Sequence, residues 1–345
     1  MSGRRPAWGP DDIGDLSGRT VVVTGATSGI GYETAVELTA HGAHTVLACR
    51  NPVAGQRCAD WMAAASPGAS VEVLEVDLAS QSSVRAAADR FKAEHARLDV
   101  LVNNAGVMGS PFALTEDGFE RQYATNHLGP FALTGLLMEL LLTTQGARVV
   151  NVSSVMHRFG RFRQNDPQRL AGRYHRWLAY SDTKLANLLF TYELDRRAEA
   201  AGSQLRSVAA HPGWARTHLA ANGPTLGGSS ARKRAGALAA HLGQSAASGA
   251  LPVLYAATMA DVSGGDYFGP GGLAEQYGPP VRVRSSRRSH RRDDAARLWA
   301  ISEELTGVHL DLGPTHPPSD DRLKRNVPVD RLTSAPSPSR TEPSA

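Results

Sequence analysis

The stretch TVVVTGATSGIG, residues 20–31, joins an apolar, β-branched run to a glycine-rich turn. A short β-branched run is typical of a buried strand. The next segment, IGYETAVELTAHG at 30–42, has the apolar spacing of a helix that ends at Gly42. Glycines allow a tight turn close to a phosphate, and the free N–H groups of the helix start favour negative charge. We therefore predict a strand, turn and helix that hold a pyrophosphate, with contacts from Gly25, Thr27, Ser28, Gly29, Ile30 and Gly31.

The same alternation of strand and helix continues along the chain. Further strands are expected at 44–50, 71–78, 98–106, 147–154 and 205–213, with a seventh piece near 265–272, and helices at 52–65, 81–95, 116–144 and 178–200. Strands separated by helices of this length form βαβ units, which build a parallel sheet with helices on both faces. We therefore predict an α/β fold, a Rossmann-type doubly wound sheet of about seven strands. Such sheets bind ligands beyond the carboxyl ends of their strands.

The two ends of the chain differ from this pattern. Residues 1–16 are polar with Gly and Pro and are expected to form a flexible arm, so that the α/β domain spans 17–281. Residues 282–312 contain an Arg-rich stretch and a segment with helical spacing at 296–308. From 313 to 345 Pro, Ser and charged residues dominate, and we expect disorder there.

Composition limits the class of protein. The 345 residues are 41% apolar and 20% charged, enough for a sizeable core, and the formal net charge of +4 does not indicate a nucleic-acid partner. The two cysteines, Cys49 and Cys58, form no C-x-x-C pair, which favours a reducing compartment. The sequence carries neither a signal peptide's apolar region nor a run of about 20 apolar residues, so we expect no membrane span and a cytoplasmic protein.

Polar residues follow the second and third strands. NAD-binding proteins usually place an acidic residue after the second strand for the ribose 2′-OH. This chain has Arg50 and Asn51 instead, and a guanidinium suits a 2′-phosphate, although Arg50 is also explained as an exposed loop residue. Asp77, with Leu78 beside it, follows the third strand, where it would bind an adenine amino group or cap a turn.

The remaining strand ends carry the other candidates. Asn104, Ala105 and Gly106 follow the fourth strand, Ser153 and Ser154 end the fifth, and Pro212, Gly213 and Thr217 follow the sixth. Tyr180 and Lys184 are four residues apart, so a helix places them on one face. This pair is either a solvated helix face or a site of proton transfer, because a nearby ammonium lowers the pKa of a phenol.

Together these motifs resemble the short-chain dehydrogenase/reductase family. The matches are T-G-x-x-x-G-x-G at 24–31, N-N-A-G at 103–106, Asn126, the serine pair, Y-x-x-x-K at 180–184 and P-G at 212–213, in the family's order over roughly 17–280. The resemblance implies that Tyr180 is the general acid or base, that Lys184 holds the nicotinamide ribose and lowers the tyrosine pKa, and that Asn126 completes a proton relay. The substrate-positioning serine would be Ser154, because the family uses the second serine and successive strand residues face opposite ways.

The long segment between Ser154 and Tyr180 and the ACRN strand end are similar to the retinol-dehydrogenase-like branch, which includes protochlorophyllide reductases and WW-domain oxidoreductases. The resemblance implies that NADP(H) is preferred over NAD(H). It also implies a carbonyl or alcohol substrate, a class that includes lipophilic compounds. Several members have an apolar N-terminal anchor, which this chain is expected to lack. No metal site is predicted, because His127 and His157 match no zinc spacing.

Three alternatives stay open. A non-catalytic NADP-binding regulator would share the fold, but it would not need the full Asn–Ser–Tyr–Lys set. The Arg-rich stretch 282–292 would be a nucleic-acid site or, as we favour, a solvated helix start followed by Asp293 and Asp294. Pairing through the helices expected at 116–144 and 178–200 would give a homodimer or homotetramer, unless the segment past 281 interferes.

Overall fold

Seven strands run parallel in one sheet, and an eighth is antiparallel at its edge. The computed structural model describes residues 7–214 and 244–313. The strand order is β3-β2-β1-β4-β5-β6-β7-β8. The strands are β1 (Thr20–Thr24), β2 (His44–Cys49), β3 (Val71–Glu75), β4 (Val100–Asn103), β5 (Arg148–Val152), β6 (Arg206–Ala210), β7 (Tyr267–Pro270) and β8 (Pro280–Arg282). The predicted Rossmann-type doubly wound fold is confirmed, with its order reversing between β1 and β4.

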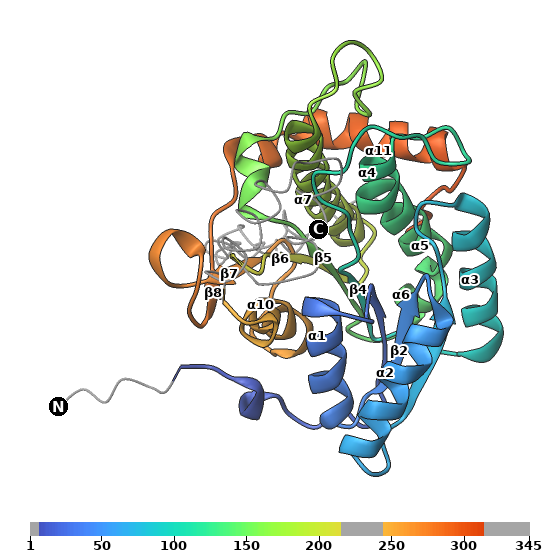
Figure 1. The fold of residues 1–345 in the computed structure, drawn as a ribbon, viewed down its shortest axis with the longest axis vertical. Helices are drawn as coiled ribbons and strands as arrows, with labels where there is room; N and C mark the ends of the chain where they lie inside the picture. The colour runs from blue at the N-terminus through green and yellow to red at the C-terminus, as the bar shows by residue number, and fades with distance from the viewer. Residues whose placement is uncertain (1–6, 215–243, 314–345) are drawn as a thin grey trace, which may run out of the picture.

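Helices cover both faces of this sheet. In Figure 1, α1 and α10 lie below the sheet and α7 and α11 above it. The α-helices are α1 (Gly29–Ala40), α2 (Pro52–Ala65), α3 (Gln81–Glu94), α4 (Arg121–Tyr123), α5 (Gly129–Leu136), α6 (Met138–Thr143), α7 (Arg176–Ala200), α10 (Ala246–Thr258) and α11 (Arg292–Thr306). The short helical turns are η1 (Pro10–Asp12), η2 (Ala124–Leu128), η3 (Val155–Phe159), η4 (Leu273–Glu275) and η5 (Arg287–His290). No helix in the described ranges is long and apolar enough to span a bilayer.

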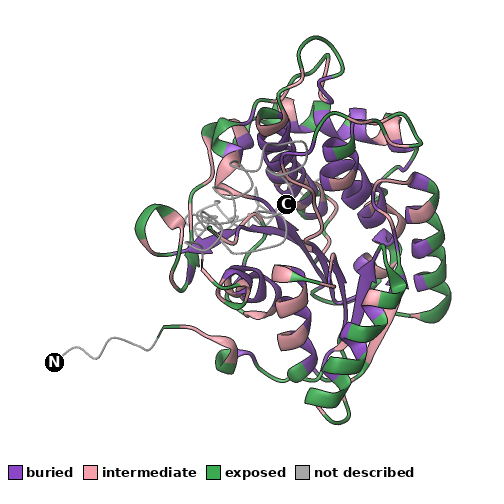
Figure 2. Cartoon of the chain, viewed as in Figure 1, coloured by how far each residue is buried: buried purple, intermediate pink, exposed green. Residues whose placement is uncertain are grey.

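Alternate residues of each central strand supply the two halves of the core. Val22 and Leu101 pack with Phe131 of α5 on one face of the sheet. Val21 and Val102 pack on the other face, against α1 and α10. Both faces are buried, as the purple strands of Figure 2 show. This explains why the strands are continuous β-branched runs instead of alternating apolar and polar residues.

The helix expected over 116–144 is wrong in its bounds. It begins at Arg121, where the Glu120 carboxylate accepts hydrogen bonds from the N–H groups of Gln122 and Tyr123. It then passes through the π-helical turn η2 into α5, and a further break at Leu137 precedes α6. A Cβ on Gly129 would collide with the backbone of Leu78, so the start of α5 packs directly against the loop after β3.

Three other regions differ from the sequence-based expectations. The sheet has one strand more than predicted, because β8 is only three residues long and has no pattern of its own. Residues 1–16 were expected to form a flexible arm, yet Ile13 and Leu16 are buried in the core cluster that contains residues of α1. The C-terminal helix begins at Arg292 instead of 296 and packs along α7. The domain boundaries themselves stay a prediction, and residues 314–345 lie outside the described ranges.

Candidate active site

The glycine-rich turn lies between the end of β1 and the start of α1. Gly25 (φ +69°) and Gly29 (φ +58°) adopt the left-handed conformation that favours glycine. A Cβ on Gly31 would collide with the Asn104 side chain and the carbonyl oxygen of Gly25. Ser28 caps α1, but its side chain makes no capping hydrogen bond, which leaves the first N–H groups of the helix for an anion. The turn therefore fits a pyrophosphate, with Thr27 and Ile30 completing the segment.

Hydrogen bonds join this turn to the end of β4. Thr24 Oγ1 donates to the carbonyl oxygen of Val102 (3.2 Å) and accepts from the N–H groups of Asn104 and Ala105 (both 3.0 Å). The Asn104 amide donates back to the carbonyl oxygen of Thr24 at 2.9 Å. The two segments therefore form one rigid wall at the point where strand order reverses, the position at which doubly wound sheets bind ligands.

Arg50 is exposed directly after β2 and forms no hydrogen bond or ion pair with the residues that the structure describes. Its neighbour Asn51 caps α2 by accepting from the Ala54 N–H at 3.0 Å. After β3, Asp77 accepts from the Ala79 N–H at 2.9 Å, so one of its oxygens caps a turn. Leu78 is a buried core residue. Of these four residues, Arg50 alone is a charged side chain without a hydrogen bond to any described residue.

Tyr180 lies on α7 and is buried within hydrogen-bonding reach of Ser154. Ser154 caps η3 by accepting from the Met156 N–H at 3.2 Å. The adjacent Ser153 faces away, and its Oγ donates to the carbonyl oxygen of Lys184 at 2.9 Å. Of the two serines, Ser154 is therefore the one that shares a site with the phenol.

Lys184 is buried one turn after Tyr180, with Nζ 5.8 Å from the centre of the tyrosine ring. Its ammonium donates to the carbonyl oxygen of Val152 at 2.9 Å, and burial lowers its pKa to about 8. Burial also raises the pKa of Tyr180 to about 12, while the Ser154 hydrogen bond acts in the opposite direction. Desolvation is thus the largest influence on the pKa of Tyr180 in this structure, and a lowering of that pKa by Lys184 stays a prediction.

Asn126 lies in the π-helical turn η2 and is fully buried. Its amide nitrogen donates to the carbonyl oxygen of Val107 (2.9 Å) and to Thr183 Oγ1 (3.0 Å), and its amide oxygen accepts from the Val107 N–H at 2.7 Å. A Cβ on Gly106 would lie 3.0 Å from that oxygen. Asn126 therefore fixes the loop after β4 against α7, and its part in a proton relay stays a prediction. π-helical turns are frequent at functional sites.

The end of β6 supplies the last of the predicted residues. Gly213 adopts a φ of +63°, and the Pro212 carbonyl oxygen accepts from the Gln244 amide at 2.6 Å. Thr217 lies outside the described residues. Pro212 and Gly213 thus follow β6 at the same edge of the sheet as the other candidates.

Two buried histidines near this edge were not assigned a role from sequence. His157 Nε2 accepts from the Ser286 N–H at 3.1 Å, so Nδ1 carries the proton and donates to the Ser154 carbonyl oxygen at 2.6 Å. Burial lowers the pKa of His157 to about 4, which keeps the ring neutral. His211 contacts Glu275 at 3.2 Å, and Arg158 contacts the same carboxylate at 2.8 Å. Apart from the hydrogen bond to Ser154, these contacts join residues more than 60 positions apart, and no local sequence pattern predicts them.

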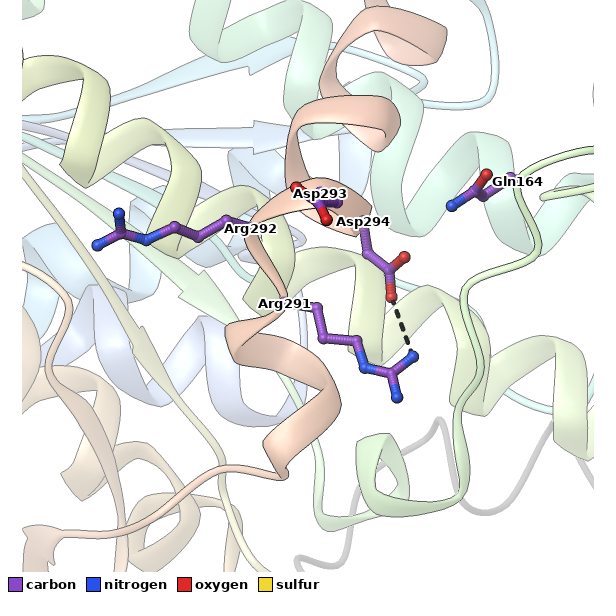
Figure 3. A pocket seen from close by; sticks show the side chains of 5 residues that line it. All are labelled: Gln164, Arg291, Arg292, Asp293 and Asp294. Carbon is purple, nitrogen blue, oxygen red and sulfur yellow. Dashed lines mark ion pairs between the residues drawn. The ribbon is translucent and has the colours of Figure 1, made fainter.

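A hollow at the start of α11 is separate from these strand ends. It is lined by Gln164, Arg291, Arg292, Asp293 and Asp294, and Figure 3 shows the ion pair of 3.8 Å between Arg291 and Asp294. None of the five residues follows a strand of the sheet. In the same Arg-rich segment Arg282 pairs with Asp266, so part of its charge is compensated internally.

Comparison with known proteins agrees with this architecture. A family model described as short chain dehydrogenase matches residues 19–225. Retinol dehydrogenase 12 of Mus musculus is 39% identical over 295 residues, which cover 85% of this chain and 88% of that protein. Retinol dehydrogenase 13 of Homo sapiens is 38% identical over 296 residues, or 85% and 86% of the two chains. The crystal structure of an uncharacterized protein from Mycobacterium paratuberculosis is 43% identical, with a TM-score of 0.72 over 88% of this chain and 99% of that one.

A doubly wound sheet with a glycine-rich turn at its switch point defines a dinucleotide-binding protein. The chain belongs to the short-chain dehydrogenase family, and its relatives are similar to it over most of its length. It is an oxidoreductase of alcohols and carbonyls that uses a nicotinamide cofactor for hydride transfer. The predicted family and enzyme class are therefore confirmed.

Proposed function

We propose that this enzyme uses NADP(H) in preference to NAD(H) and acts on a lipophilic carbonyl compound or the corresponding primary or secondary alcohol. The observation that carries the proposal is the group formed by the half-buried Ser154 with the buried Tyr180 and Lys184 at the carboxyl ends of the strands. A phenol held between a hydroxyl and an ammonium suits proton exchange with the oxygen of a carbonyl or alcohol.

Each group has a separate task in this proposal. The glycine-rich turn would hold the pyrophosphate, Arg50 the 2′-phosphate, and Lys184 the nicotinamide ribose. A bound nicotinamide supplies or accepts the hydride. Ser154 donates a hydrogen bond that orients the substrate oxygen, and Tyr180 gives its proton to that oxygen in reduction or receives one in oxidation. Val152 and Asn126 keep these groups in place through the hydrogen bonds to Lys184 and to the loop after β4.

Exposed apolar side chains favour a lipophilic substrate. Phe112, Phe159 and Trp214 follow β4, β5 and β6, and all three are about half or more exposed. Loops at this edge surround the ligand in doubly wound sheets. Retinol dehydrogenases 12 and 13 are named for a lipophilic alcohol, which supports the same substrate class here.

Replacing Tyr180 with Phe tests the proposed acid. The change removes the transferable proton and keeps the ring, so turnover with NADPH should fall on the order of 10²-fold or more while NADPH binding stays nearly unchanged. Tyr192→Phe is the matched control, because Tyr192 lies on the same helix and its hydroxyl is hydrogen-bonded to Ser285 instead of Ser154. Steady-state rates on a panel of lipophilic aldehydes and ketones provide the measurement. Most of the turnover surviving in Tyr180→Phe would exclude Tyr180 as the acid.

Arg50→Ala tests the proposed cofactor preference. Loss of a charge-assisted hydrogen bond costs about 1.5–3 kcal/mol, or roughly ten- to a hundred-fold in NADPH affinity. NADH has no 2′-phosphate, so its dissociation constant should hardly change. Arg57→Ala, an exposed arginine on α2, is the control. Equal wild-type affinity for both cofactors, or equal weakening of both by Arg50→Ala, would make NAD(H) the better assignment.

We also infer a reducing compartment such as the cytoplasm. Cys49 and Cys58 are both free and buried, and burial raises the pKa of each thiol, which disfavours the reactive thiolate. A protein that works in an oxidising compartment gains stability from disulfides, which neither cysteine provides here.

A further inference from the structure

Two histidines and a glutamate meet at the edge of the sheet opposite the cofactor turn. His44 is the first residue of β2, Glu72 is the second residue of β3, and His95 caps the C-terminal end of α3. The site described above lies at the carboxyl ends of the strands, whereas His44 and Glu72 lie at their amino ends. This His44–Glu72–His95 cluster therefore takes no part in the proposed hydride transfer.

The geometry of the cluster brings one ligand atom from each residue to a common point. These three atoms all lie within 4.8 Å of one another. His95 Nε2 is 2.7 Å from one oxygen of Glu72, and His44 Nε2 is 3.7 Å from the other. The two imidazole rings lie side by side, with centroids 5.2 Å apart. It is the single group of three such side chains found within residues 7–214 and 244–313.

One atom of the cluster lacks the partner that its burial demands. His44 Nε2 is inaccessible to solvent and has no hydrogen-bond partner. The other ring nitrogen, Nδ1, is hydrogen-bonded to Ser70 Oγ at 2.6 Å, which fixes the orientation of the ring. A buried ring nitrogen without a partner costs free energy, and a metal ion between the ring and the carboxylate would remove that cost. Outer hydrogen bonds of this kind commonly orient metal-binding histidines.

The three side chains are partly exposed to solvent. The side chains of His44, Glu72 and His95 are 27%, 31% and 13% exposed, so the cluster opens to solvent on one side. The His95 ring also lies against the Phe91 ring, with centroids 4.4 Å apart and an angle of 31° between the planes, which limits the positions that the His95 ring can take. Two imidazoles, one carboxylate and a water molecule form a ligand set that Zn²⁺ accepts in tetrahedral geometry.

We propose that the His44–Glu72–His95 cluster binds one divalent transition-metal ion, with Zn²⁺ as the ion that its ligands fit. The ion would connect the starts of β2 and β3 with the end of α3. Its effect would be on stability, because the cluster lies away from Tyr180. The proposal does not depend on the substrate or cofactor assigned above.

Zinc titration of the full-length chain tests the proposal. After treatment with a chelator and its removal, isothermal titration calorimetry with ZnCl₂ should give one site per chain, and Zn²⁺ should raise the unfolding temperature by mass action. Glu72→Gln and His95→Ala should each weaken Zn²⁺ binding by at least about tenfold, since even outer-shell changes cost about 10- to 100-fold. Glu72→Gln keeps the side-chain shape and a hydrogen-bonding group for His95, so it should fold as the wild type does.

His41→Ala is the control for the zinc titration. His41→Ala removes a histidine at the end of α1 that is bonded to the Glu37 carbonyl oxygen and lies outside the cluster, so it should bind Zn²⁺ as the wild type does. Co²⁺ used as a spectroscopic probe should give ligand-field absorption in the wild type and in His41→Ala, but not in Glu72→Gln. Absence of Zn²⁺ binding in the wild type, or equal binding by wild type and Glu72→Gln, would overturn the proposal and leave a hydrogen-bonded His95–Glu72 pair.

Discussion

At the scale of single residues, the buried ammonium of Lys184 makes stability depend on pH. Its pKa of about 8 in the folded protein lies below the 10.5 of an exposed lysine. The unfolded chain therefore binds more protons between pH 8 and 10.5, so the free energy of unfolding rises with pH across that window. Below pH 8 the charge costs the folded state on the order of 3 kcal/mol, because each pKa unit corresponds to about 1.4 kcal/mol.

Lys184→Met should remove this cost. The variant should be more stable than wild type at pH 7, and the difference should shrink as pH rises from 8 toward 10. The Val152 carbonyl oxygen stays hydrogen-bonded in the variant, because Asn187 donates to it at 3.2 Å. Tyr180, with its raised pKa, remains in both proteins, so the difference isolates Lys184. Urea unfolding of both proteins at several pH values measures it, and a difference that does not vary with pH would contradict the argument.

At this scale the sequence identified the side chains of the candidate site, but it did not predict how deeply each side chain is buried. The motifs brought Ser154, Tyr180 and Lys184 into one hypothesis, and the structure brings these side chains together, although their catalytic roles stay predictions. The direction of the Tyr180 pKa shift could not be predicted, because it depends on burial by distant segments. The partners His44 and His95 are 51 positions apart with no spacing rule to connect them, so the cluster was missed for the same reason.

At the scale of elements, the long segment between η3 and α7 is held to α7 by a buried ion pair. Arg169 Nε donates to Asp182 at 2.6 Å, and both side chains are nearly inaccessible to solvent. The other oxygen of Asp182 accepts from the Arg161 N–H at 2.8 Å. Because Asp182 lies two residues after Tyr180, this pair fixes the segment beside the candidate site.

Arg169→Ala should destabilise the protein by about 3–5 kcal/mol, since it leaves a buried carboxylate without its charged partner. Trypsin should then cleave faster at Arg173 in the loosened segment. Arg163 lies 4.0 Å from the same carboxylate and is 47% exposed, so Arg163→Ala should cost less than about 1 kcal/mol. Thermal unfolding and timed digestion of the three proteins measure both effects. Similar losses in the two variants would contradict a special role for Arg169.

The elements themselves were predictable where the local pattern was strong. The predicted strands at 20–25, 44–50 and 71–78 correspond to β1, β2 and β3, because a buried parallel strand is marked by its own residues. The helix expected at 116–144 failed because its bends depend on tertiary contacts. Gly129 packs against the backbone of Leu78, and the Asn126 side-chain oxygen accepts a hydrogen bond from the Val107 N–H. Neither contact can be predicted from the sequence around the helix alone.

At the scale of the whole molecule, α11 occupies the helical face through which pairing was expected. Trp299 lies against Phe131 of α5 and Phe190 of α7, with ring centroids 5.4 and 5.9 Å apart, and the Arg197 guanidinium lies 4.2 Å from the centre of the Trp299 ring. Ser302 Oγ is 2.8 Å from His127 Nε2 beneath the same helix. A second copy could use this face of α7 only by displacing α11.

We therefore expect the full-length chain to be a monomer in solution. Light scattering after size-exclusion chromatography should give the mass of one chain across micromolar concentrations. Trp299→Ala should cost about 3–5 kcal/mol, as large-to-small changes in a core do, and should expose Phe131 and Phe190. That variant should associate as concentration rises, because the uncovered surface is apolar. Trp61→Ala is the control, since Trp61 is already exposed on α2. A wild-type dimer in which hydrogen exchange is slowed along α7 would show that α11 does not block the pairing.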